Sequence, residues 1–195
     1  MADHVTWTCG CGETSARVDV RDGTRAICYC DDCQAFSRVT DHETWLDEAG
    51  GSDLFQTTPD RIEMLRGAGN LAVLRLSDKG PLRWYVTCCG APFANTLTTR
   101  QVPFSSLQVH GFSDPDAAGP VSIRVNRKFA RARVEGKQTP IWPMVASFMK
   151  RAAAARLSGR HRQTPFFDDG GAPVAEVRRL TPEERQAAYA PPKGH

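Results

Sequence analysis

The sequence predicts a mainly β domain followed by a helical C-terminal extension. Through the first 110 residues, short apolar and β-branched runs alternate with turns that contain Gly or Asp. Helical spacing of apolar residues becomes clear only after residue 140. A chain of 195 residues with 41% hydrophobic composition is long and apolar enough to bury one core.

Seven runs in the first part of the chain are predicted to be strands that pair through tight turns into a compact antiparallel domain. The connecting segments, such as 21–24 and 66–70, contain the Gly, Asp or Asn that such turns require. An alternating segment, Val121–Val125, adds a further strand. The seven runs are Ala16–Val20, Ala26–Tyr29, Leu54–Thr57, Arg61–Leu65, Leu71–Leu76, Leu82–Thr87 and Pro103–His110.

Two helices are predicted in the later part of the chain. The first has Pro143 in its first turn and apolar residues at helical spacing, and Gly159 can cap its end. The second begins at Thr181, where Glu184 completes a capping box. We therefore divide the chain into a β domain, residues 1–120, and a basic strand and helix extension packed on it, residues 121–195.

The positive charge is concentrated in one stretch, although the net charge is only +3. Residues 121–162 hold 11 Lys and Arg against the single acidic residue Glu135, whereas residues 1–120 hold 10 against 16 acidic residues. This basic segment indicates a patch for an anion, whether nucleic acid, an acidic protein or a small carboxylate. A solvated helix face balanced by the acidic part of the chain is an equally good interpretation.

The number of cysteines points to metal binding or catalysis. The sequence contains no apolar run of about eighteen residues and no N-terminal layout typical of a secretory signal, so we expect a cytoplasmic protein without membrane association. Disulfides are uncommon in that reducing compartment, and 7 cysteines cannot all pair. Their alternative role is that of small buried hydrophobic residues with one redox pair.

The middle cysteine group is the strongest motif. Cys28, Cys30 and Cys33 lie within six residues, and a C-x-x-C spacing turns two thiolates back on one ion. Zinc accepts such thiolates in tetrahedral coordination at about 2.3 Å. Three protein ligands leave a fourth position open, as in catalytic zinc sites. The three residues are therefore the candidate catalytic as well as metal-binding residues.

The first and last cysteine groups predict a second, structural site. Cys9 and Cys11 are expected at a strand end followed by Gly12, and Cys88 and Cys89 follow the predicted strand Leu82–Thr87, so two hairpin ends can share one ion held by four thiolates. Adjacent cysteines on an extended chain point to opposite faces, and only a sharp turn at Gly90 aims both at one metal. This favours Cys89 over Cys88. The expected cofactor is one or two zinc ions.

Other candidate residues have weaker support. Four histidines, His4, His42, His110 and His161, stand alone, and a lone histidine is more often a surface or core residue than a ligand. Asp31 and Asp32 either orient a bound water beside the metal or form the turn between Cys30 and Cys33, and the turn is favoured. The sequence has no P-loop, no dinucleotide fingerprint and no G-x-S-x-G motif.

The cysteine order resembles that of the glutathione-dependent formaldehyde-activating enzyme (GFA)/CENP-V family over about residues 5–112. It reads C-x-C, then C-x-C-x-x-C-Q ending at Gln34, then a late Cys-Gly. The resemblance implies a β-tent fold, a structural zinc on the first and last pairs, and a second zinc on the middle group. There the family's carbon–sulfur lyase chemistry, glutathione hydroxymethylation, would occur.

The sequence departs from the family pattern in several places. Val86 stands where the family's last motif, C-x-x-C-G, has its first cysteine. Tyr29 lies where His is frequent, Arg38 lies where Gly is frequent, and the chain continues about eighty residues past the usual domain. The chain therefore resembles a divergent subgroup.

Two classes of function remain open. A zinc enzyme would act on a thiol adduct at the middle cysteines, while Arg124, Arg127 and Arg131 hold the carboxylates of a small acidic thiol such as glutathione. A non-catalytic zinc-stabilised module would instead bind nucleic acid or an acidic partner through residues 121–162. Few aromatic residues interleave with the basic ones, which disfavours stacking on single strands. The small thiol is slightly favoured, because the family resemblance implies a thiol site beside the middle cysteines and the segment has no recognisable nucleic-acid motif. The sequence does not indicate the oligomeric state.

Overall fold

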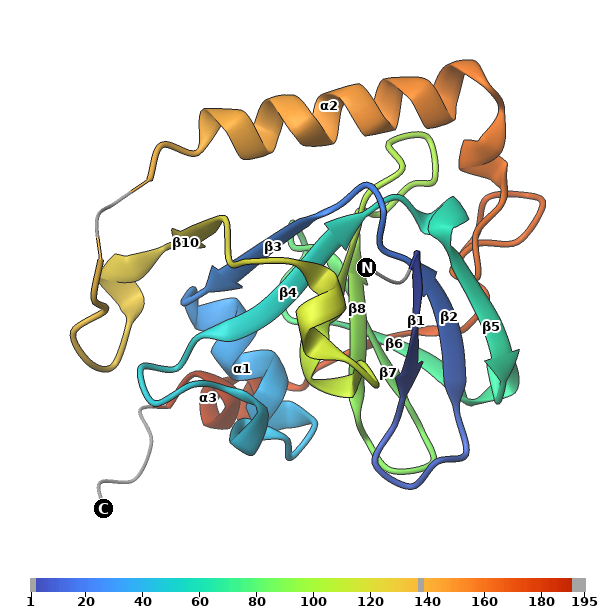
Figure 1. Cartoon of the computed structure of the whole chain (residues 1–195). Coiled ribbons are helices and arrows are strands. Elements are labelled where there is room, and N and C mark those ends of the chain that lie inside the picture. Colours follow the sequence, from blue (N-terminus) through green and yellow to red (C-terminus); the bar gives the residue numbers. More distant parts are fainter. Residues whose placement is uncertain (1–2, 137–138, 191–195) are drawn as a thin grey trace.

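The chain forms a mainly β structure with a helical C-terminal part, as predicted (Figure 1). The computed structural model describes residues 3–136 and 139–190. Within these residues there are eleven strands and three α-helices, namely α1 (Asp31–Val39), α2 (Trp142–Leu157) and α3 (Pro182–Tyr189).

The strands form a small sheet and a large one. The small sheet is antiparallel, in the order β1-β2-β5, and comprises β1 (His4–Thr8), β2 (Ser15–Asp19) and β5 (Ile62–Arg66). The large sheet has the order β10-β3-β4-β9-β8-β7-β6-β11. Its strands are β3 (Thr24–Cys28), β4 (Ser52–Thr57), β6 (Leu71–Arg75), β7 (Leu82–Val86), β8 (Pro92–Thr96), β9 (Ser105–Gln108), β10 (Ile123–Val125) and β11 (Val177–Arg179).

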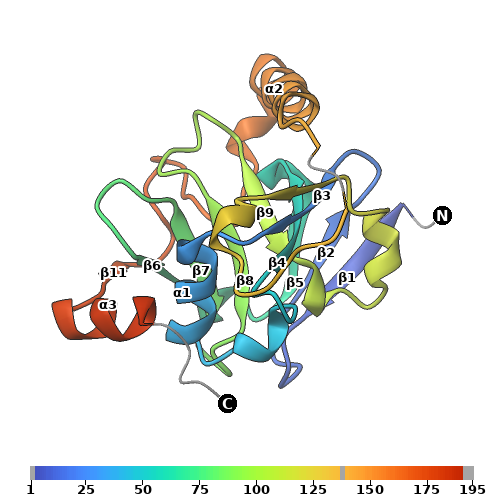
Figure 2. The same cartoon turned by 90° about the vertical axis from the view of Figure 1, so that its left-hand side faces the viewer.

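Both outer strands of the large sheet come from the part of the chain after residue 120. β10 pairs with β3 and β11 pairs with β6, and both pairs are parallel, unlike the antiparallel pairing predicted for the domain. α3 packs beside α1 (Figure 2), and α2 extends along one side of the molecule (Figure 1). The domain boundary at residue 120 stays a prediction, and the parallel pairs join the two segments through backbone hydrogen bonds.

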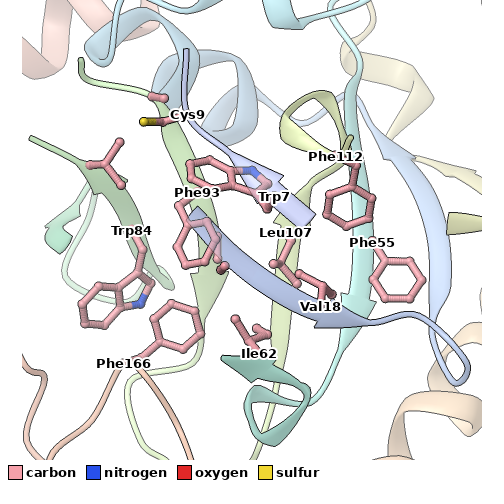
Figure 3. Packing of buried hydrophobic residues seen from close by; sticks show 14 of the residues in the cluster. Trp7, Cys9, Val18, Phe55, Ile62, Trp84, Phe93, Leu107, Phe112 and Phe166 are labelled. Carbon is pink, nitrogen blue, oxygen red and sulfur yellow. The ribbon is translucent and has the colours of Figure 1, made fainter. Parts of the chain in front are cut away.

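The apolar core lies between the two sheets, and aromatic side chains dominate it (Figure 3). Trp7 of β1 contacts Phe93 of β8 with ring centroids 4.5 Å apart, and Trp84 of β7 contacts Phe166 at 5.0 Å. All four rings are fully buried. Phe166 belongs to the segment after α2, so the C-terminal part of the chain contributes to the same core.

The sequence-based expectations missed several elements. Strands β8 and β11 were not predicted, and β1 was expected only as an unbounded strand ending near Cys9. Pro103–His110 forms only the four-residue β9 before a 3₁₀ turn at Val109–Gly111. The largest correction is α1. Asp31 and Asp32 occupy the first turn of this helix rather than an isolated turn, and their charge is favourable at a helix N-terminus.

The two later helices follow the predicted signals closely. α2 has Pro143 in its first turn, and Gly159 adopts φ +76 just beyond its end. In α3, Thr181 and Glu184 form both hydrogen bonds of the capping box. Among the described residues, no helix has the length and apolar character needed to cross a membrane.

Replacement of Phe166 tests whether the C-terminal segment shares the core. We expect Phe166→Ala to lower the free energy of unfolding by about 3–5 kcal/mol, since a fully buried ring is lost. Leu157→Ala is the matched control, because Leu157 is 89% exposed and its loss should change stability by less than about 0.5 kcal/mol. Urea unfolding followed by circular dichroism measures both. Equal, small effects would mean that the segment lies outside the core.

Candidate metal centre and adjoining cavity

Four cysteines from two distant turns form one cluster, which we call the cysteine quartet. Its members each place a sulfur atom within 4.8 Å of the others. The sulfur of Cys9 lies 3.5 Å from that of Cys11 and 3.7 Å from that of Cys88. All of these cysteines are free thiols. The quartet consists of Cys9, Cys11, Cys88 and Cys89.

Two glycine turns direct the four cysteine side chains of the quartet toward one another. Gly12 adopts φ +78 after β1, and its N–H bonds to the carbonyl of Cys9 at 2.9 Å. Gly90 adopts φ +76 after β7, and its N–H bonds to the carbonyl of Val86 at 2.9 Å. A side chain at either position would be strained in this left-handed region. The turn at Gly90 brings Cys88 as well as Cys89 into the group.

The quartet contains a thiol that ionises readily. Cys9 is 3% exposed, and burial alone would raise its pKa. The hydrogen bond from the backbone N–H of Thr14, at 3.3 Å, and the neighbouring thiols outweigh burial and lower the pKa of Cys9 to about 7. Thiolate is the form that binds metal. The surroundings of Cys9 therefore favour a metal ligand.

The middle cysteines form a second cluster, which we call the cysteine triad. Cys28 ends β3, Cys30 is the N-cap residue of α1, and Cys33 lies in the first turn of that helix. Their sulfur atoms lie within 4.8 Å of one another, and those of Cys28 and Cys30 are 3.4 Å apart. The side-chain amide of Asn126 also contacts the Cys28 sulfur at 3.4 Å. The helix N-terminus favours negative charge on these sulfurs.

Arg83 is a buried cation beside the triad. Its side chain is only 5% exposed, and its Nη1 lies 3.6 Å from the sulfur of Cys33. Hydrogen bonding from Cys28 and Cys30 lowers the pKa of Cys33 well below its ordinary value against the effect of burial, and the charge of Arg83 adds to this. Arg83 also forms an ion pair with the carboxylate of Asp32, at 3.6 Å. Arg83 thus supplies fixed positive charge to the site.

A row of buried polar side chains extends from Arg83 across three neighbouring strands. Arg83 donates to Asn95 Oδ1 at 3.0 Å, and Asn95 donates to Ser106 Oγ at 3.1 Å. These residues are direct cross-strand partners on β7, β8 and β9. None of these residues was singled out from the sequence. The available signal was a charged residue between Leu82 and Trp84 in a strand with both faces buried.

The triad and this polar row line a cavity of about 800 Å³. Its other walls are Leu54, Ile123 and Val125 of the large sheet, Phe104, and the segment Thr139–Met144 that leads into α2. Arg124, Asn126 and Arg127 also line it, whereas Arg131 does not. Instead Arg131 contacts Gln34 at 2.7 Å and Glu43 at 2.9 Å. The cavity therefore combines thiols, two accessible arginines and apolar walls.

The C-terminal helix supports the helix that carries the triad. Tyr189 of α3 donates a hydrogen bond of 2.5 Å to Asp32, the residue that also faces Arg83. Arg38 of α1 donates to the carbonyl of Ala188 at 2.6 Å. In this way α3 holds the first turn of α1 in place beside the cavity.

None of the four predicted histidine candidates joins a cysteine group within the described residues. His42 contacts the carbonyl of Thr40, and His110 stacks on Trp45 with ring centroids 4.5 Å apart. His161 is buried near the end of α2, and His4 is exposed at the start of β1.

The sulfur geometry of both clusters fits a zinc ion. Four sulfurs arranged tetrahedrally at about 2.3 Å from zinc are about 3.8 Å from one another. The separations of 3.5, 3.7 and 3.4 Å between the sulfur atoms are close to this spacing. The quartet offers four thiolates and the triad offers three, and both donor sets suit zinc. The residues present could therefore hold a metal at each place.

Comparisons with known proteins give a family but no activity. A family model described as a family of unknown function, DUF6151, matches residues 1–178. A crystal structure of a Rhodobacter sphaeroides protein from a structural genomics programme is similar at a TM-score of 0.41 and 19% identity. That similarity covers 60% of this chain and 96% of the other. No curated protein matches the chain.

Metal content is the first measurement that the clusters call for. We expect the purified protein to carry one or two zinc ions per chain, because two groups of thiols stand at ligand spacing. Elemental analysis measures this, and dialysis against a strong chelator should lower the melting temperature as the metal leaves. A metal-free protein that melts at the same temperature with and without added zinc would contradict the assignment.

The two clusters should differ in what they do for the fold. Cys9→Ser removes a buried member of the quartet, which joins two distant turns, and should lower the melting temperature by about 10 °C or more as its metal is lost. Cys30→Ser is the matched change in the triad, whose members lie within six residues, and should cost clearly less. Thermal unfolding with metal analysis of each variant measures the difference. Equal losses would indicate two structural sites.

Proposed function

The chain belongs to the DUF6151 family, and from its site we propose that it is a zinc protein that binds a small acidic thiol, or a thiol adduct, in the cavity beside the cysteine triad. The observation that carries this proposal is the difference between the two cysteine clusters. The quartet offers four sulfurs, whereas the triad offers three and lines a cavity of about 800 Å³.

This difference matches the distinction between structural and reactive zinc sites. Structural sites are closed by four protein ligands, and catalytic sites keep one position for substrate. When bound at the triad, zinc supplies Lewis acidity toward a thiol sulfur or a carbonyl oxygen. We assign to Cys28, Cys30 and Cys33 the role of holding it, and to the quartet the role of stabilising the fold.

Charged residues around the cavity suit a ligand with carboxylates. Arg124 and Arg127 line the cavity, and none of the lining residues is acidic. The carbonyls of Val134 and Gly136 accept hydrogen bonds from Arg127 and hold it in place. Guanidinium groups bind carboxylates with paired, charge-assisted hydrogen bonds. Arg83, which is buried, stabilises negative charge on the triad side of the cavity. A glutathione-like thiol has both features, a sulfur and two carboxylates.

The reaction proposed for this site is the reversible joining of a thiol to an aldehyde. The sulfur forms a bond to the carbonyl carbon, the carbonyl π bond breaks, and the thiol proton ends on the former carbonyl oxygen. Nothing is oxidised or reduced. The reverse direction is a carbon–sulfur lyase reaction, as implied by the resemblance of the cysteine order to the GFA/CENP-V family. A reducing, cytoplasmic environment would keep both cysteine clusters and the ligand in their thiol form.

A non-catalytic module that binds nucleic acid through residues 121–162 is the alternative. The positions of the basic side chains favour the small ligand. Arg124 and Arg127 line the cavity, Arg131 is bonded to Gln34 and Glu43, and Arg151 is 5% exposed. These four cations therefore lie in separate places. Binding of a phosphate backbone requires one continuous basic face, which they do not form.

Binding of glutathione tests this proposal. We expect isothermal titration of the zinc-loaded protein to show saturable binding, with affinity lowered about tenfold by Arg124→Gln, a loss of about 1.4 kcal/mol. Arg133→Gln removes a charge from the same segment at an 89% exposed side chain and should leave affinity unchanged. S-methylglutathione, which lacks the free thiol, should bind more weakly. Salt-dependent oligonucleotide binding without any response to glutathione would support the alternative module instead.

A further inference from the structure

A second, strongly basic cavity lies at the other end of α2. It has a volume of about 680 Å³ and shares no lining residue with the cavity of the triad. Four segments meet there: the connection between β8 and β9, the last turn of α2, the 3₁₀ turn Arg160–Arg162, and the turn after Phe167. The side chains that line it are Arg100, Gln101, Arg156, His161, Arg162 and Asp169.

Three guanidinium groups line this cavity without ion-pair partners. In the part of the chain that the structure describes, no carboxylate lies within 4.0 Å of the side-chain nitrogens of Arg100, Arg156 or Arg162. Asp169 is the single acidic residue in the lining. Like charges gathered at one hollow repel one another, and a bound anion offsets that repulsion. The arrangement is therefore favourable when an anion is present.

Two of the three arginines are held in fixed positions. Arg100 donates to the backbone carbonyls of Asp168 at 2.8 Å and of Asp169 at 2.6 Å. Arg156 donates through Nη1 to the side chain of Gln101 and to His161, at 3.1 Å. Each guanidinium retains further N–H groups for a ligand, because these contacts do not use all five. Fixed donors lose little conformational entropy when a ligand binds.

His161 contributes a buried polar group to the same place. Its residue is 7% exposed, and its Nε2 faces Arg156. Because a guanidinium only donates hydrogen bonds, Nε2 accepts, and the proton of the neutral ring is on Nδ1. That Nδ1 is buried and has no hydrogen-bond partner among the described residues. The hydrogen bond between His161 and Arg156 therefore helps to hold Arg156 at the cavity.

We propose that this cavity is a binding site for a phosphate-type oxyanion carried by a small molecule. Arginines match the oxygen geometry of phosphate, and several of them around one hollow suit a dianion. A nucleic acid is a poorer match, because the lining contains no aromatic residue for stacking and the cations converge on a hollow instead of following an extended backbone. Such a site would give a role to the positive charge at the C-terminal end of the basic segment. It is independent of the proposed thiol site.

Calorimetric titration with inorganic phosphate and with glycerol phosphate, at constant ionic strength, tests this proposal. We expect saturable binding of both to the full-length, zinc-loaded protein. Arg162→Gln should weaken it at least tenfold, and Arg156→Gln should weaken it as well. Arg162 is the better probe because it has no side-chain hydrogen bond among the described residues, so its replacement leaves the fold intact. A thermal melt of each variant verifies this.

Two controls distinguish a site from general basicity. Lys150→Gln removes one exposed positive charge from the same helix outside the cavity and should leave phosphate affinity unchanged. Cys30→Ser should also leave it unchanged, so a failure of the thiol proposal would not affect this result. The proposal is overturned if phosphate does not bind saturably, or if Lys150→Gln and Arg162→Gln lose phosphate affinity equally. It is also overturned if an oligonucleotide binds and phosphate does not displace it.

Discussion

The convergence of four thiols from turns that are far apart in the sequence is the constraint on which the rest of the structure depends. Cys9 and Cys11 close the β1–β2 hairpin of the small sheet, whereas Cys88 and Cys89 follow β7 of the large sheet. Sulfur atoms at 3.5–3.7 Å are in contact without being bonded. As thiolates they would repel one another unless a cation lay between them. A metal shared by the four thiolates would remove this repulsion and tie the small sheet to the large one.

This placement gives the large sheet two different faces. Because side chains alternate along a strand, Trp84 and Leu107 point into the apolar core while their neighbours Arg83 and Ser106 face the cavity. The core side gives stability through burial of large aromatic rings. The cavity side holds a charged row beside the triad, in which Arg83 Nη1, Asn95 and Ser106 are joined by hydrogen bonds that offset part of the cost of their burial. Stability and chemistry thus occupy opposite faces of one sheet.

The sequence reveals the parts of this arrangement that depend on local patterns. The three cysteine groups, the start of α2 and the capping box at Thr181 are visible because spacing and residue type alone indicate them. Arg83 was missed because its role depends on cross-strand register, which places Asn95 opposite it and α1 above it. The helix α1 was missed because it is only nine residues long and begins inside the cysteine motif. The basic cavity depends on four segments that only the tertiary fold brings together.

We propose that the two cysteine clusters are metal sites of different kinds, one closed and one open to a cavity. Anomalous diffraction at the zinc absorption edge from crystals of the purified protein tests this most directly. We expect one ion surrounded by the four sulfurs of the quartet, and another bound by the three sulfurs of the triad with a non-protein ligand facing the cavity. Density for a single ion, or a triad ion closed by a fourth protein ligand, would contradict it.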